Sequence, residues 1–123
     1  MTNQDIIKPA AQSPQSVLDR EAALSRVGGD GELLHEIAQI FLEDYPRSLA
    51  ELREAARLGD ARGVERTAHG LKGSAANFGA RPVVDAAFAL EKMGHEQDLA
   101  DFSAVLGTLE QALSKFKSEL EEL

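Results

Sequence analysis

The sequence predicts an all-α protein, an antiparallel up-down four-helix bundle with a short additional N-terminal helix. Three observations support this fold class. Apolar residues recur at steps of three and four in four long segments, as they do on the buried face of a helix. No segment alternates apolar and polar residues in the manner of a half-buried strand. The connections between the segments are short, which favours antiparallel neighbours.

Residues 1–15 differ from the rest of the chain. They contain Pro9 and Pro14, several glutamines and serines, and no sustained periodicity. Such a segment lacks the apolar face through which a helix packs on a core, so we expect a flexible N-terminal tail. The bundle domain is then expected over residues 16–123.

Turn and capping residues mark the first two helices. A short amphipathic helix is expected from about Ser16 or Asp19 to Val27, followed by two glycines. Asp30 is a good N-cap for a long second helix, inside which Pro46 lacks an amide hydrogen. The apolar pattern continues in register beyond the proline, so we predict one kinked helix. Its apolar face is Leu33, Leu34, Ile37, Ile40, Phe41, Tyr45, Leu49 and Leu52.

The next two helices are bounded by capping and glycine residues. Asp60 is expected to cap a third helix over about residues 61–78, which Gly79 closes. Pro82 suits the first turn of a fourth helix, and Gly94 is expected to end it. The apolar faces are Val64, Ala68, Leu71, Ala75 and Phe78 in the third helix, and Val83, Ala86 or Ala87, Leu90 and Met93 in the fourth.

The last helix has the most regular pattern in the chain. Asp98 is expected to cap it, with Asp101 in its first turn. The apolar positions are Leu99, Phe102, Leu106, Leu109, Leu113, Phe116 and Leu120. Their alternating steps of three and four are typical of helices that pack in bundles.

Composition and charge narrow the classes of function. The chain has no cysteine, which excludes disulfides and thiolate metal sites. It has no apolar run long enough to span a bilayer and no signal-peptide pattern, so we expect a cytoplasmic protein that does not bind membranes. The net charge of −8 opposes non-specific binding to nucleic acid. Residues 57–81 nevertheless carry five basic and two acidic side chains. This basic segment is either a solvated face or a site for phosphate and an acidic partner.

His69 lies within the basic segment, on the predicted third helix. Ala68 and Leu71 belong to the apolar face, so His69 is expected at the edge of that face. Much of an imidazole is uncharged near neutral pH, and its nitrogen lone pair can attack phosphorus. The product is anionic. Lys72, one turn later, can pair with it, and Arg66, one turn earlier, is a second candidate.

Small residues follow His69. Gly70 and Gly73 lie inside the predicted helix, where glycine is less favourable than alanine by roughly 0.5–1 kcal/mol. Gly73 shares a face with His69, and with Ala76 it leaves clearance for a phosphoryl group and an approaching backbone. Gly70 lies off that face and is expected to permit close contact with another helix.

Other chemistries are not supported by the spacing of the residues. The order Lys-Gly-Ser at residues 72–74 reverses the order that a P-loop needs, and the serine is not in a Gly-x-Ser-x-Gly motif. No paired histidines or Glu-x-x-His motif suggest a metal site, so we expect no metal. His35 lies among acidic residues on a polar face and His95 is expected in a loop, so neither has the neighbours of His69.

The run AHGLKGSAANFGA at residues 68–80 resembles the signature of histidine-containing phosphotransfer (HPt) domains. These domains are intermediates in multistep two-component phosphorelays. Further agreement comes from VGGD at residues 27–30, FLED at residues 41–44 and LE at residues 90–91. The similarity extends over about residues 17–121.

The resemblance implies that His69 accepts a phosphoryl group from an aspartate of one receiver domain and passes it to an aspartate of another. Lys72 would steady the phosphoryl group, and Gly73 would allow the receiver to dock. The implied partners are response-regulator receiver domains, with a hybrid sensor kinase as a further candidate. This chain would bind no cofactor, because the receiver would supply Mg²⁺. It would be a phosphoryl carrier and not an enzyme with ATP-dependent kinase activity, and we expect a monomer.

A second hypothesis belongs to another class of function. A helical adaptor that binds receiver domains or other helical partners would share this fold without carrying phosphate, and it would not require His69. An autonomous enzyme is disfavoured, because no second catalytic group accompanies the histidine.

Overall fold

The computed structural model describes residues 16–123, and the flexible tail expected over residues 1–15 lies outside the described residues. The described part contains five α-helices and no strand. The helices are α1 (Arg20–Arg26), α2 (Gly31–Arg57), α3 (Ala61–Ala76), α4 (Arg81–Glu96) and α5 (Phe102–Glu121). The predicted all-α class is confirmed.

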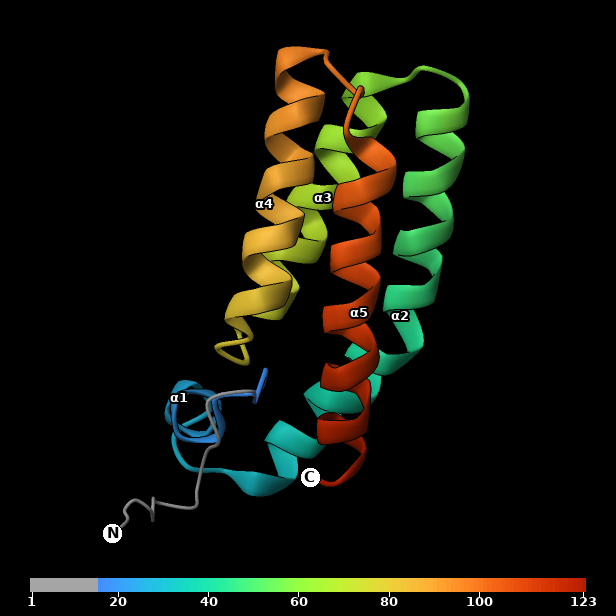
Figure 1. Ribbon diagram of the computed structural model, residues 1–123. Helices are drawn as coiled ribbons and strands as arrows, with labels where there is room; N and C mark the ends of the chain where they lie inside the picture. The colour runs from blue at the N-terminus through green and yellow to red at the C-terminus, as the bar shows by residue number, and fades with distance from the viewer. Residues whose placement is uncertain (1–15) are drawn as a thin grey trace, which may run out of the picture.

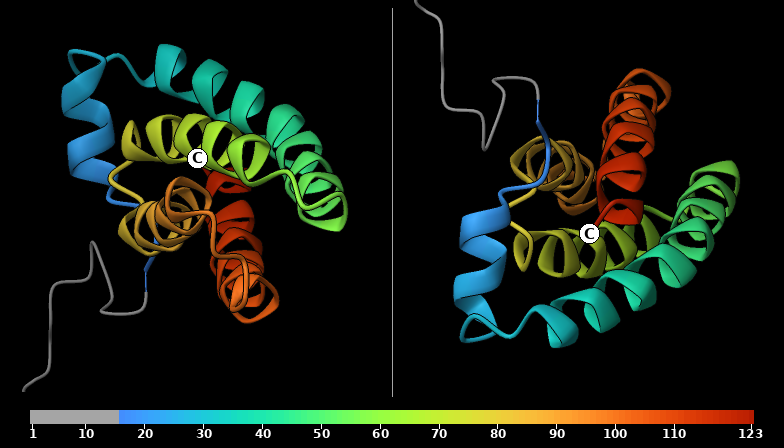
Figure 2. Two further views of the ribbon diagram at one scale, coloured as in Figure 1. Left: turned by 90° about the horizontal axis from the view of Figure 1, so that it is seen from above. Right: turned by 90° about the horizontal axis from the view of Figure 1, so that it is seen from below.

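Four long helices form an antiparallel bundle. Figure 1 shows α2, α3, α4 and α5 running alternately up and down. Helix α3 packs against α4 over most of its length and also against α2, while α5 contacts both α4 and α2 and so closes the ring. The short helix α1 lies across one end of the bundle (Figure 2).

The starts of the first three helices agree with the sequence prediction. Asp19, Asp30 and Asp60 directly precede α1, α2 and α3. Each carboxylate accepts a hydrogen bond from the amide three residues later, at 2.9 to 3.1 Å, and so satisfies an amide that the helix leaves unpaired. Helix α2 continues through Pro46 as a single helix, and Figure 2 shows that it curves along the bundle.

The end of α4 and the start of α5 differ from the prediction. Gly94 does not end α4, because the helix continues past it to a left-handed residue, Gln97, with φ 58°. Asp101 and not Asp98 is the N-cap of α5. The Asp98 carboxylate accepts a hydrogen bond from the amide of Ala100 at 3.1 Å, which stabilises a turn before the helix begins.

Aromatic and aliphatic side chains fill the core. The rings of Phe41, Phe78 and Phe116 meet edge to face, with centroids 5.1 to 5.7 Å apart. Most of the apolar positions predicted on α3, α4 and α5 are buried. On α2, Leu33 and Ile40 are exceptions, with 40% and 56% of their surface exposed. No helix of the described part is long and apolar enough to cross a membrane.

Candidate functional site

Helix α3 presents His69 to solvent. The helix packs on the core through Val64, Ala68, Leu71 and Ala75, which are buried. His69 lies at the edge of that face, as the sequence predicts, and 67% of its side chain is exposed. A partner molecule therefore has access to the ring.

Glu91 of α4 holds the His69 ring. Its Oε2 lies 2.8 Å from His69 Nδ1, which is a short hydrogen-bond distance. Only 18% of the Glu91 side chain is exposed, so the carboxylate is confined between the helices. An ionised carboxylate can only accept hydrogen bonds, so Nδ1 carries the hydrogen. In the uncharged ring the lone pair is then on Nε2, so the exposed ring has one defined nucleophilic nitrogen.

Lys72 is joined to the same carboxylate. Its Nζ lies 2.7 Å from Glu91 Oε1, so each oxygen of Glu91 has a partner on α3. The hydrogen bond from Lys72 lowers the pKa of Glu91, burial of the carboxylate opposes this effect, and the hydrogen bond from His69 lowers the pKa further. The net shift is downward, which keeps Glu91 ionised at neutral pH. The Lys72 ammonium also lies 5.1 Å from the centroid of the Phe88 ring, within the range of a cation–π interaction.

A hollow between α3 and α4 adjoins the His69 ring. Its volume is about 690 Å³, and it is lined by Arg62, Glu65, Arg66, His69, Gly70, Glu91 and His95. Arg66 is exposed and forms no ion pair with another residue of the described part. Its guanidinium is therefore available to an anion in the hollow.

A second histidine–carboxylate pair crosses from α3 to α4 at this hollow. His95 lies within α4 and not in a loop, so the sequence prediction for it is wrong, because the helix continues past Gly94. His95 Nδ1 lies 3.1 Å from Glu65 Oε2. This pair lies one helical turn from the pair of His69 and Glu91, with the histidine on the opposite helix. Within residues 16–123 no group of three or more His, Asp or Glu side chains is arranged to hold a metal ion.

The small residues near His69 leave open space. Gly73 is exposed, and a Cβ placed on it would meet no atom within 4 Å. The same is true of Gly70, so the expectation that this glycine permits close contact between helices is wrong. Ala76 is half-buried in the last turn of α3. No large side chain therefore projects from Gly70, Gly73 or Ala76 on the outer surface of α3 next to the imidazole.

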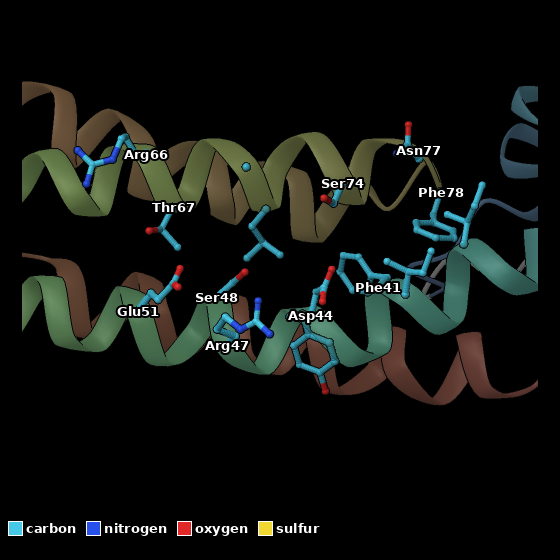
Figure 3. A pocket seen from close by; sticks show the side chains of 15 residues that line it. Phe41, Asp44, Arg47, Ser48, Glu51, Arg66, Thr67, Ser74, Asn77 and Phe78 are labelled. Atoms are coloured by element: carbon cyan, nitrogen blue, oxygen red, sulfur yellow. The ribbon is translucent and has the colours of Figure 1, made fainter.

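A groove lies on the other side of α3, against α2. Its volume is about 520 Å³. Figure 3 shows that it is bordered by Asp44, Ser48 and Glu51 of α2 and by Thr67 and Ser74 of α3. The exposed side chain of Ile40 also lines it. Arg66 and Gly70 line both this groove and the hollow against α4, so the two surfaces meet along the exposed face of α3.

The residue pattern did not predict Glu91 or Phe88 as part of the site. Glu91 contributed only to the family resemblance, as part of the dipeptide LE at residues 90–91. A signal was present in the spacing, because Glu91 follows the buried Leu90 just as His69 follows the buried Ala68. Both residues therefore lie at the edge of an apolar face, where side chains of neighbouring helices meet.

Comparisons with known proteins agree with this geometry. The family model described as the Hpt domain matches residues 36–121. No curated protein matches the sequence. The crystal structure of histidine-containing phosphotransfer protein B (HptB) from Pseudomonas aeruginosa PAO1 is similar, with a TM-score of 0.82 and 22% sequence identity, over 90% of this chain and 95% of that chain. At this identity the structural similarity shows a shared fold.

Proposed function

The chain belongs to the Hpt domain family, and from this membership we propose that it carries a phosphoryl group on His69 between receiver-domain aspartates in a multistep two-component phosphorelay. The observation that carries the proposal is the exposed His69 ring, held at Nδ1 by the Glu91 carboxylate. A phosphoryl carrier needs a reactive nitrogen that is both accessible and oriented. This pair of residues supplies both properties.

In the proposed transfer, His69 Nε2 attacks the phosphorus of an aspartyl phosphate. The nitrogen–phosphorus bond forms while the bond from phosphorus to the aspartate oxygen breaks, and the electron pair leaves with the carboxylate. Nδ1 keeps its hydrogen, so the phosphorylated ring is positively charged, and the Glu91 carboxylate at 2.8 Å stabilises that charge. Onward transfer is the reverse step, with the aspartate of a second receiver as the nucleophile.

Lys72 and Arg66 are proposed to stabilise the phosphoryl group. Lys72 lies one turn from His69, and Arg66 lines the hollow beside the ring without an ion-pair partner in the described part. Both cations suit a group that carries two negative charges. Gly73 and Ala76 are proposed to provide the clearance that a docking receiver needs.

The proposed partners are receiver domains of response regulators, with a hybrid sensor kinase as a further source of phosphoryl groups. The basic segment over residues 57–81 favours a partner whose site is acidic. We expect the protein to act as a cytoplasmic monomer without a cofactor or ATP-dependent kinase activity of its own. Mg²⁺ bound by the receiver would neutralise negative charge on the phosphoryl group.

His69→Gln tests the carrier assignment. A receiver domain carrying ³²P on its aspartate is mixed with the wild-type chain and with the variant. We expect the wild-type chain to gain an acid-labile, base-stable label and the variant to gain none, because glutamine has no nucleophilic nitrogen of this kind. His35→Gln is the matched control, since His35 is also exposed but lies on α2.

Two outcomes would favour the adaptor hypothesis instead. One is equal labelling of the wild type and His69→Gln. The other is a wild-type chain that binds the receiver in a titration but never gains label. In either case the shared fold would serve binding without transfer through His69.

A further inference from the structure

The backbone of α3 approaches α4 closely at Gly94. A Cβ placed on this buried glycine would lie 2.5 Å from the carbonyl oxygen of Ala61, 2.6 Å from the amide nitrogen of Glu65 and 2.9 Å from its Cα. Ordinary contacts of a Cβ begin at 3.4 Å. Because all three atoms belong to the backbone of α3, no side-chain movement relieves the overlap. Only glycine fits at this crossing.

Nothing else about the position requires glycine. Gly94 lies inside α4 and its φ is not positive, so an alanine there would have an ordinary helical backbone. Glycine is the poorer helix former of the two. The feature that distinguishes the position is therefore the approach of α3, which a methyl group would prevent.

Two hydrogen bonds between side chains span the same crossing. Glu91, one turn before Gly94, reaches His69 at 2.8 Å. His95, the residue after Gly94, reaches Glu65 at 3.1 Å. Both bonds join α4 to α3, so both depend on the separation of the two helix backbones next to Gly94.

We propose that Gly94 is a positioning residue for phosphotransfer. It sets the separation of α3 and α4 at which the Glu91 carboxylate bonds to His69 Nδ1 and directs Nε2 outward. The part of this inference that concerns transfer rests on the proposed function. An alanine must move the nearest backbone atoms outward from 2.5 Å, and an ordinary Cβ contact begins at 3.4 Å. An equal displacement of Glu91 from His69 would take their 2.8 Å hydrogen bond out of range.

Gly94→Ala and Gly107→Ala form a matched pair for the test. Gly107 lies inside α5, and a Cβ there would meet no atom within 4 Å. Circular dichroism checks that each variant is helical, and ¹⁵N NMR of the imidazoles reports which ring nitrogen carries the hydrogen. Phosphotransfer from a labelled receiver is timed on the same samples.

We expect Gly107→Ala to match the wild type in the NMR spectra and in the transfer rate. In Gly94→Ala, the rings of His69 and His95 should both change from a fixed Nδ1–H form toward the tautomer mixture of a free imidazole. The transfer rate should fall roughly tenfold, because the attacking nitrogen is no longer held in line. In a Glu91→Ala background, Gly94→Ala should lower the rate by less than about twofold, since the hydrogen bond through which it acts is already absent.

Three results would overturn the proposal. The first is an unchanged ring tautomer of His69 in Gly94→Ala. The second is an equal loss of rate in the presence and absence of Glu91. The third is a variant that does not fold even in trimethylamine N-oxide, which favours compact states, because Gly94 would then be required for folding. If the wild-type chain gains no label, the proposed function fails while the NMR comparison still decides the role of Gly94.

Discussion

The two flanks of α3 differ in what fills them. Toward α4, side chains bridge the helices, since His69 and Lys72 share the Glu91 carboxylate and Glu65 bonds to His95. Toward α2, a groove of about 520 Å³ lies between the helices (Figure 3). Both flanks are hollowed, but among the described residues hydrogen bonds and ion pairs between side chains cross only the α4 flank.

Under the proposed function, this difference separates the positioning of the His69 ring from access to it. A ring that is already held by a carboxylate needs little reorganisation when it reacts. An open surface with mixed apolar and polar lining is suited to contact with another protein. Changes on the α4 flank should therefore alter the rate of transfer within a complex, and changes that fill the open surface of α3 should alter formation of the complex.

Gly73→Leu should have the largest effect on receiver binding. The position is exposed and no atom lies within 4 Å of a Cβ there, so a leucine would extend into the space proposed for a docked receiver. We expect the dissociation constant for a receiver, measured by titration calorimetry, to rise at least about 100-fold, or about 2.7 kcal/mol. Gly107→Leu on α5 is the control. Undiminished binding by Gly73→Leu would show that the receiver docks elsewhere.

Glu91→Ala should have the next largest effect, on the rate within the complex. Removal of the carboxylate leaves His69 Nδ1 and Lys72 without their shared partner, so we expect phosphotransfer to slow roughly 10- to 100-fold. Receiver binding should stay within about twofold of the wild type. Glu91→Gln should recover part of the rate, because its amide oxygen still accepts from Nδ1–H. A binding defect as large as the rate defect would remove the distinction between the flanks.

The fold and the candidate histidine follow from local features of the sequence. The periodic apolar residues predict the helices, and aspartates predict where three of them begin. The apolar neighbours of His69 predict that its ring is exposed at the edge of the buried face. Such signals act within one helix or one turn, so a single sequence contains them. The same local reasoning failed at Gly94, because glycine is also a common helix terminator. Only the packing of α3 distinguishes a glycine that ends a helix from one that admits a neighbour.

The polar bridges of the α4 flank could not be predicted in this way. Glu91 and His69 are separated by 22 residues, and their contact depends on the register of two antiparallel helices. The helix ends and the close approach of the two backbones at Gly94 are features of that packing which no single helix reveals. His95 illustrates this dependence. Because α4 was predicted to end at Gly94, His95 was placed outside the helix, and its hydrogen bond to Glu65 was not predicted.

Lys72→Ala should have the smallest of these effects on transfer. Lys72 is one turn from His69 and now pairs with Glu91, so its loss should slow transfer about tenfold or less while the ring stays held by Glu91. Lys92→Ala is the matched control, because Lys92 is an exposed lysine of α4 without an ion pair to any described residue. An equal slowing in both variants would indicate a general effect of positive charge.

The same variant makes a prediction about acid stability that is independent of any receiver. The pKa of Glu91 is depressed in the folded chain, chiefly by Lys72, so the pair contributes stability above the ordinary carboxyl pKa. That contribution is lost as the pH falls through the depressed value. In Lys72→Ala the pKa of Glu91 should move upward, so acidification should reduce the free energy of unfolding by less than in the wild type. Urea unfolding at about pH 7 and about pH 3.5 measures both differences. An equal acid loss in the two proteins would mean that the Lys72–Glu91 pair does not persist in solution, and the α4 flank would then be less firmly held than its geometry indicates.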